Sequence, residues 1–269
     1  GLGALFVEAK RAANVRADVR AGQGLFQRAG LLMRVEHIGD ATLYLADCRD
    51  VLPTLQPVEA VITDPPYGIN DAPIKGQGRT GKRVGASNVW HAASTWDASI
   101  DPEWPLLCGR VAAVVAWFGH WRKREEVTAA MRYPLRAEIV WAKDCHVGPP
   151  CPVAMRDERI WLYAAEGIKG HTFETSVWDC PIIPTWSHKE HKNEKPVALM
   201  ERLVMFLGPQ SVCDPFMGSG TTGVACAKLG RAFVGIEQDP AHFDTACRRI
   251  ADAYAQPRLF APSPPAKPV

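Results

Sequence analysis

Short apolar runs rich in β-branched and aromatic residues alternate with segments of helical periodicity along most of this chain. Strands that are covered by helices on both faces of a parallel sheet have this continuous apolar character. The strand candidates are residues 41–46, 60–63, 111–118, 137–142, 159–164, 211–213 and 232–236. The helix candidates are residues 48–55, 121–131, 196–207, 222–229 and 240–255. The alternation therefore predicts an α/β domain with a mostly parallel sheet of seven strands and helices on both faces.

Size and composition agree with such a domain. The chain has 269 residues, of which 47% are hydrophobic, enough for a large core. It lacks the run of about 20 apolar residues that a membrane span needs, and its first residues lack the order of a secretory signal, so we expect a cytoplasmic protein. The eight cysteines show no CxxC spacing, which predicts reduced thiols and no metal site. The net charge of +2 neither requires nor excludes a nucleic-acid partner.

The ends of the chain and two long loops interrupt this pattern. Residues 1–32 are basic and predict an N-terminal arm or helix outside a single domain at 33–255, and residues 256–269 predict an unpacked tail that is rich in proline. Residues 68–97 and 166–195 fit neither strand nor helix. Loops of this length in a compact domain are usually functional or disordered.

The first of these loops carries the best candidates for phosphate contacts. They are Lys75, Arg79, Lys82 and Arg83, in a segment that is also rich in glycine. Lysine and arginine side chains supply most of the sequence-independent affinity for nucleic acid. The alternative is a solvated loop with no ligand.

A glycine-rich turn between a strand and a helix predicts a ligand with an anionic group. In residues 211–223, Ser-Val-Cys-Asp-Pro-Phe-Met-Gly-Ser-Gly-Thr-Thr-Gly, Gly218 and Gly220 allow close approach of the backbone, and a helix that starts near Thr222 aims N–H groups at a carboxylate or phosphate. Glu237 ends the next predicted strand, where it could accept hydrogen bonds from the hydroxyls of a ribose. The alternative is a simple turn followed by an unrelated surface glutamate.

A second turn, Asp64-Pro65-Pro66-Tyr67, follows the apolar residues 60–63. One reaction that such a turn could support is methylation of an amino group on a nucleobase. The amino nitrogen of adenine or cytosine is a poor nucleophile because its lone pair is delocalised into the ring. Two acceptors that hold its hydrogens favour a more tetrahedral nitrogen, and the Asp64 carboxylate and the Pro65 carbonyl could be these acceptors. Tyr67 offers a face on which an extruded base can stack. The alternative is a rigid turn with a packed tyrosine.

Together the two turns resemble the DNA amino-methyltransferase family, with DPPY at 64–67 and DPFMGSGTTG at 214–223. The catalytic motif comes first, as in the beta class. The resemblance implies a circularly permuted, Rossmann-like S-adenosylmethionine-dependent methyltransferase fold. It places Asp47 and Phe216 beside the cofactor and Lys195 near its methionine carboxylate. The cofactor-binding residues on this interpretation are Asp47, Asp64, Lys195, Asp214, Phe216, Gly218, Ser219, Gly220, Thr221, Thr222 and Glu237.

The resemblance further implies methylation of double-stranded DNA by base flipping. Family members that modify cytosine N4 tend to have serine at the position of Asp64, so the acid favours adenine N6. The target-recognition segment would lie at residues 166–188, and a homodimer is the expected assembly. Alternatives are cytosine N4, an RNA base or a protein amide as acceptor, or a catalytically silent DNA-binding subunit of a partner enzyme.

Overall fold

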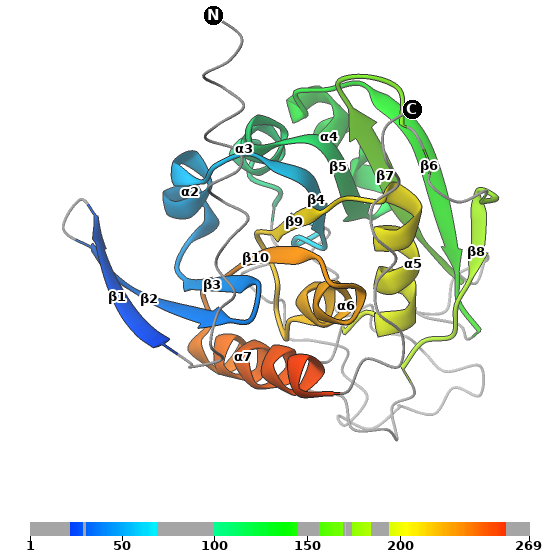
Figure 1. The fold of residues 1–269 in the computed structure, drawn as a ribbon. Helices are drawn as coiled ribbons and strands as arrows, with labels where there is room; N and C mark the ends of the chain where they lie inside the picture. The colour runs from blue at the N-terminus through cyan, green and yellow to red at the C-terminus, as the bar shows by residue number, and fades with distance from the viewer. Residues whose placement is uncertain are drawn as a thin grey trace, which may run out of the picture.

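A computed structural model describes residues 22–28, 31–68, 99–144, 156–168, 170, 174–183 and 194–256. In this part of the chain ten strands form one sheet in the order β1-β2-β3-β10-β9-β4-β5-β7-β6-β8 (Figure 1). The strands are β1 (Gly22–Arg28), β2 (Leu31–Ile38), β3 (Ala41–Leu45), β4 (Val58–Thr63), β5 (Ala112–Gly119), β6 (Leu135–Ala142), β7 (Asp157–Ala164), β8 (Val177–Asp179), β9 (Ser211–Asp214) and β10 (Ala232–Glu237). The central strands β3, β10, β9, β4 and β5 are all parallel.

The sheet contains every predicted strand, but the predicted number of seven was wrong. The additional strands are β1, β2 and β8. β1 and β2 form an antiparallel hairpin at one edge and overlap the end of the segment 1–32, which was expected to be an arm or helix. β8 has three residues and pairs with β6 inside a stretch that appeared irregular in the sequence. All three additional strands lie at or beside the two ends of the sheet.

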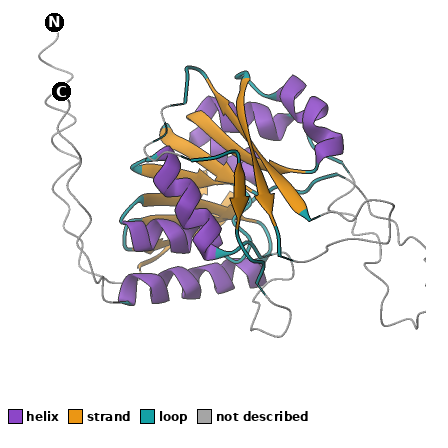
Figure 2. Ribbon diagram, turned by 90° about the vertical axis from the view of Figure 1, so that its right-hand side faces the viewer, coloured by secondary structure: helices purple, strands orange, loops and turns teal. Residues whose placement is uncertain are grey.

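Helices cover both faces of the sheet (Figure 2). One face carries α2 (Cys48–Val51), α3 (Glu103–Val111) and α4 (Arg124–Ala130), and the other carries α5 (Val197–Leu207), α6 (Thr221–Leu229) and α7 (Pro240–Ala255). The helix α3 was not predicted from the sequence, where Pro105 interrupts its apolar pattern. Proline is tolerated there, since it lies in the first turn of the helix. None of the helices in the described ranges is long and apolar enough to span a lipid bilayer.

Alternate residues of the central strands enter the two halves of the core. Val61 and Trp117 pack with α2, α3 and α4, whereas their neighbours Ile62 and Phe118 pack with α5, α6 and α7. All four side chains are at most 1% exposed. Burial on both faces thus explains why these strands have continuous apolar sequences.

The strand directions gather several segments at one edge of the sheet. The parallel strands β3, β10, β9, β4 and β5 all have their carboxyl ends there. β7 runs antiparallel to β5, pairing Arg159 with Gly119, so the beginning of β7 reaches the same edge. Ligands of open α/β sheets bind at this edge.

Candidate active site

The Asp-Pro-Pro-Tyr turn begins where β4 ends. Asp64 follows Thr63, the last residue of β4, and is partly buried. The Tyr67 hydroxyl donates a hydrogen bond to Asp64 Oδ1 at 2.8 Å. Pro65 and Pro66 have no N–H to extend the ladder of the sheet, and their rings fix the backbone. The turn therefore holds a carboxylate and an aromatic ring in a fixed relation.

Gly68 closes this turn with a φ of +65°. A Cβ atom at this position would lie 2.8 Å from the backbone nitrogen of Ile100 and 3.0 Å from the carbonyl carbon of Ser99. Glycine is thus required both for the backbone conformation and for the close approach. Gly68 thus packs directly against Ser99 and Ile100, which follow residues 69–98 in the sequence.

The glycine turn lies between β9 and α6, next to β4. Gly218 and Gly220 have φ values of +51° and +83°, respectively. A Cβ atom on Gly218 would meet no atom within 4 Å, so this side of the turn faces open space. The backbone of Gly218 donates a hydrogen bond to Glu237 Oε2 at 2.9 Å. The turn and the acid at the end of β10 therefore form one structure, as the sequence predicts.

Asp214, the last residue of β9, holds the glycine turn through hydrogen bonds and connects it to β4. Its Oδ1 accepts hydrogen bonds from Thr63 Oγ1 at 2.8 Å and from the backbone of Phe216 at 3.1 Å, and its Oδ2 accepts one from Thr222 Oγ1 at 2.6 Å. Burial raises the pKa of Asp214 to about 6, although these bonds oppose the rise. The bond from Thr63 joins the two turns across adjacent parallel strands.

Other predicted cofactor positions surround the glycine turn. Ser219 and Thr221 are buried, and Phe216 makes an edge-to-face contact with Trp104 at 4.9 Å between ring centroids. Asp47 follows β3, which pairs with β10, and it caps α2 by accepting a hydrogen bond from the backbone of Arg49.

Glu237 completes this part of the site. Its Oε1 accepts hydrogen bonds from the backbones of Gln238 at 2.9 Å and Asp239 at 2.8 Å. With the bond from Gly218, the protein fixes the orientation of the carboxylate at the end of β10. A carboxylate oxygen can accept more than one hydrogen bond, so Glu237 retains capacity for a ligand hydroxyl.

Lys195 contacts the Asp-Pro-Pro-Tyr turn rather than the glycine turn. Its Nζ lies 2.6 Å from Asp64 Oδ2, 3.2 Å from the Tyr67 hydroxyl and 3.1 Å from Glu158 Oε2. Glu158 also accepts hydrogen bonds from Tyr67, at 3.1 Å, and from Lys143. Two carboxylates, two ammonium groups and one phenol thus form a continuous cluster behind the turn.

Burial and neighbouring charges shift the pKa values of the groups in this cluster. Burial raises the pKa of Asp64 against the effect of the Lys195 ammonium, and the neighbouring Glu158 raises it further. Burial alone would also raise the pKa of Glu158, but Lys195 and Lys143 outweigh it and lower that pKa to about 2. Burial, followed by Asp64 and Glu158, raises the pKa of Tyr67. Tyr67 therefore remains a protonated hydrogen-bond donor at neutral pH.

Three charged groups of this edge, Lys143, Glu158 and Arg249, were not predicted from the sequence. Glu158 lies at the start of β7, and a prediction of mostly parallel strands gave no reason to bring that end to the site. Arg249 on α7 donates hydrogen bonds to Ser219 Oγ and to the Ser219 carbonyl, both at 2.8 Å, and pairs with Glu194. The position of Arg249 in the polar stripe of an amphipathic helix gave no separate signal, whereas the charged run 157–159 before a buried strand could have been noticed.

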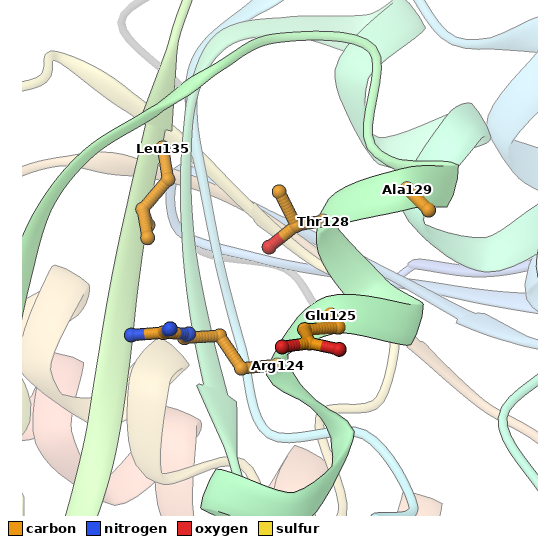
Figure 3. A pocket seen from close by; sticks show the side chains of 5 residues that line it. All are labelled: Arg124, Glu125, Thr128, Ala129 and Leu135. Atoms are coloured by element: carbon orange, nitrogen blue, oxygen red, sulfur yellow. The ribbon is translucent and has the colours of Figure 1, made fainter.

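Other predicted features lie outside the described residues or away from this edge. The residues outside the described part include Lys75, Arg79, Lys82 and Arg83, and positions 169, 171–173 and 184–188 of the predicted target-recognition segment. A shallow hollow of about 430 Å³ between α4 and β6 is lined by Arg124, Glu125, Thr128, Ala129 and Leu135 (Figure 3). None of the predicted site residues lines it. A cavity of about 20 Å³, room for about one water molecule, adjoins Tyr67 and Glu158.

Comparison with known families decides the classification. The sequence profile of the DNA methylase family matches residues 114–248, about half of the chain. The chain belongs to this family. The matched region contains Lys195, the glycine turn and Glu237, and the Asp64 turn precedes it.

Individual members of the DNA methylase family resemble the chain to different extents. The type II methyltransferase M2.MboI of Moraxella bovis is 31% identical over 86 residues, which span 30% of this chain and 32% of that protein. The alignment thus spans about a third of the relative. The crystal structure of an M1.HpyAVI–SAM complex has 22% identity and a TM-score of 0.60, covering 78% of this chain and 98% of the other. The cytosine-N4-specific PvuII DNA methyltransferase has 14% identity and a TM-score of 0.58, covering 81% and 92%. Both structures share the fold.

Proposed function

We propose that this protein transfers a methyl group from S-adenosylmethionine to the N6 amino group of adenine in double-stranded DNA, with the base flipped out of the helix. The observation that carries the proposal is the joining of the two turns. The Asp64 turn and the Gly218 turn follow neighbouring parallel strands, and the Thr63–Asp214 hydrogen bond connects them. A methyl donor on one turn and an amine on the other would therefore share one edge of the sheet.

The residues of the glycine turn fit the proposed cofactor. Open space at Gly218 permits close approach of a ligand, and the fixed Glu237 carboxylate suits the hydroxyls of a ribose. We place Phe216 and Asp47 at the adenine end, and Ser219, Gly220, Thr221 and Thr222 at the amino-acid end. The bound cofactor supplies an electrophilic methyl group on a sulfonium. The complex of M1.HpyAVI with SAM supports this assignment by analogy of fold.

The catalytic turn would activate the amine by holding its hydrogens. Asp64 and the Pro65 carbonyl accept from the amino group, so that its lone pair is released from the ring towards the methyl donor. Tyr67 provides the face on which the extruded base stacks, worth about 1–3 kcal/mol. Positioning and electrostatics supply the acceleration, and no strong base is required.

Lys195 has a different role in this proposal from the one that the resemblance implies. Its contacts lie with Asp64 and Tyr67, so we assign it to the catalytic turn rather than to the methionine carboxylate. The ammonium favours the ionised form of Asp64, which is the form that accepts hydrogen bonds from an amine.

Asp64 favours adenine as the target. The similarity of fold to the cytosine-N4-specific PvuII enzyme keeps cytosine N4 as the second candidate. We also infer that the fold is a circular permutation, since β4, which carries the catalytic turn, precedes β9 in the chain and pairs with it. Contacts to the DNA backbone are assigned to Lys75, Arg79, Lys82 and Arg83.

The nature of the product tests the proposal directly. Duplex DNA of mixed sequence is incubated with the protein and the cofactor, digested to nucleosides and analysed by mass. N6-methyl-2′-deoxyadenosine is the expected product. N4-methylcytosine would transfer the assignment to the second candidate, and cofactor binding without any methylated base would indicate a silent subunit.

Two substitutions separate the proposed roles. Asp64→Asn should abolish transfer and leave the affinity for the cofactor within about threefold, because it removes charge from an acceptor of the amine. Glu237→Gln should weaken cofactor binding by about 1.5–3 kcal/mol, through lost charge-assisted hydrogen bonds. Binding is measured by calorimetry without DNA. Equal losses of cofactor binding in both variants would contradict the division of roles.

A further inference from the structure

We propose that Glu158 is a positioning residue that keeps Tyr67 and Lys195 in place around Asp64, and so sets how well Asp64 accepts the target amine. This inference rests on the proposed function. It adds a residue that belongs to neither turn and that comes from an antiparallel strand.

The carboxylate of Glu158 contacts three polar side chains of the cluster. Its Oε2 lies 3.1 Å from both the Tyr67 hydroxyl and Lys195 Nζ, and its Oε1 accepts a hydrogen bond from Lys143. Asp64 meets the same two partners, Tyr67 at 2.8 Å and Lys195 at 2.6 Å. Glu158 and Asp64 therefore compete for one phenol and one ammonium, and the position of each partner depends on both carboxylates.

The balance of charge explains why this competition matters. Lys143 and Lys195 are only 7% and 8% exposed. Lys143 forms an ion pair with Glu158, and Lys195 forms one with Asp64. Loss of the Glu158 charge would leave two buried ammonium groups facing one carboxylate. Lys195 would then bind Asp64 alone, and the stronger ion pair would make that carboxylate a poorer acceptor for a neutral amine.

The surroundings of Glu158 contain further charged groups that any substitution must take into account. His120, Asp157 and Arg159 line the cavity of about 20 Å³ that Glu158 and Tyr67 adjoin. Arg159 pairs with Asp157 at 2.8 Å and with Glu138 at 2.6 Å, so its charge is already compensated. The groups within contact distance of the Glu158 carboxylate in the described structure are Tyr67, Lys143 and Lys195.

The first measurement needs neither substrate nor activity. The protein is labelled with ¹³C at the aspartate carboxyl groups, the Asp64 signal is assigned with Asp64→Asn, and its pKa is measured by NMR. Because the Glu158 charge raises the pKa of Asp64, Glu158→Gln should lower it. The matched control is Glu174→Gln, which breaks a partly buried ion pair with Arg202 away from both turns and should leave that pKa unchanged.

The second measurement is the single-turnover rate of methylation against pH. Glu158→Gln should slow transfer by about tenfold or more at neutral pH, the effect of losing a charge-assisted hydrogen bond, and move the acid limb to lower pH. Cofactor affinity should stay within about twofold. Glu158→Asp retains the charge and should give smaller changes of the same sign. In a cycle with Tyr67→Phe, the two losses of rate should be less than additive.

The outcomes separate this inference from the proposed function. A wild-type rate and an unchanged Asp64 pKa in Glu158→Gln would overturn it. If that variant does not fold, Glu158→Asp takes its place, and a wild-type rate of transfer in that variant would overturn the inference, because the shorter side chain withdraws the carboxylate from Tyr67 and Lys195. If the wild-type protein methylates no duplex, the proposed function fails, and a lowered Asp64 pKa would still support the electrostatic role of Glu158.

Discussion

Replacement of Asp214 by asparagine should change how the stability of the protein depends on pH. Asp214 is 3% exposed, and its pKa of about 6 lies above the ordinary aspartate value of 3.8. The folded state therefore binds this proton more tightly than the unfolded chain does. A difference of about 2 pKa units corresponds to about 3 kcal/mol. Asparagine is neutral at every pH, so Asp214→Asn removes this dependence.

The sign and the range follow from the two pKa values. The stabilisation from the bound proton is complete below pH 3.8 and is lost as the pH rises through about 6. The free energy of unfolding of the variant, minus that of the wild type, should therefore rise by about 2 kcal/mol between pH 4 and pH 7. The remainder of the change falls below pH 4. Any constant offset from the altered bond to Thr222 does not affect this slope.

Urea denaturation of both proteins at pH 4, 5, 6 and 7 measures the difference, and other groups that titrate equally in both proteins cancel. Thr222→Val provides an independent check. It removes a hydrogen bond that lowers the pKa of Asp214, so the transition should move to higher pH. A difference between wild type and Asp214→Asn that stays constant over this range would refute the assigned burial of charge.

Two further predictions concern the turns. Gly218→Ala should lower the free energy of unfolding by about 1–2 kcal/mol because the φ of Gly218 is +51°, and it should also weaken cofactor binding. The control is Gly208→Ala, at the end of α5, where φ is +65°. This variant should show only the loss of stability. Urea denaturation and calorimetry of both variants test this, and equal cofactor affinities would contradict it. Lys195→Met removes the charge that lowers the pKa of Asp64, so the acid limb of the methylation rate should move to higher pH. A limb at the wild-type position would show that Asp64 does not control it.

The sequence predicted the central sheet and both turns because these depend on local signals. Apolar runs such as 60–63 are buried on both faces, and glycines such as Gly218 have backbone conformations that other residues rarely adopt. The pairing of Glu237 with the glycine turn followed from the order of strand, turn, helix and strand.

The remainder of the site depends on strand direction and on contacts between distant segments. Nothing in residues 157–164 shows that β7 runs antiparallel to β5, and this direction alone brings Glu158 to Lys195. The resemblance placed Lys195 near the cofactor, but the contact with Asp64 depends on how α5 packs on the sheet. The hairpin of β1 and β2 was missed because basic and polar residues interrupt the apolar pattern of residues 22–38, which had been taken in part for an N-terminal arm.

The contact of Gly68 with Ser99 and Ile100 brings together the two points of the chain that flank residues 69–98. Gly68 and Ser99 lie at almost the same point of the structure, so the rest of the fold places little restriction on the number of residues between them. Doubling such an insert changes the closure free energy by only about 0.6 kcal/mol. A longer or shorter segment between these two anchors should therefore change the free energy of unfolding little, as long as Gly68 keeps its contact with Ser99 and Ile100.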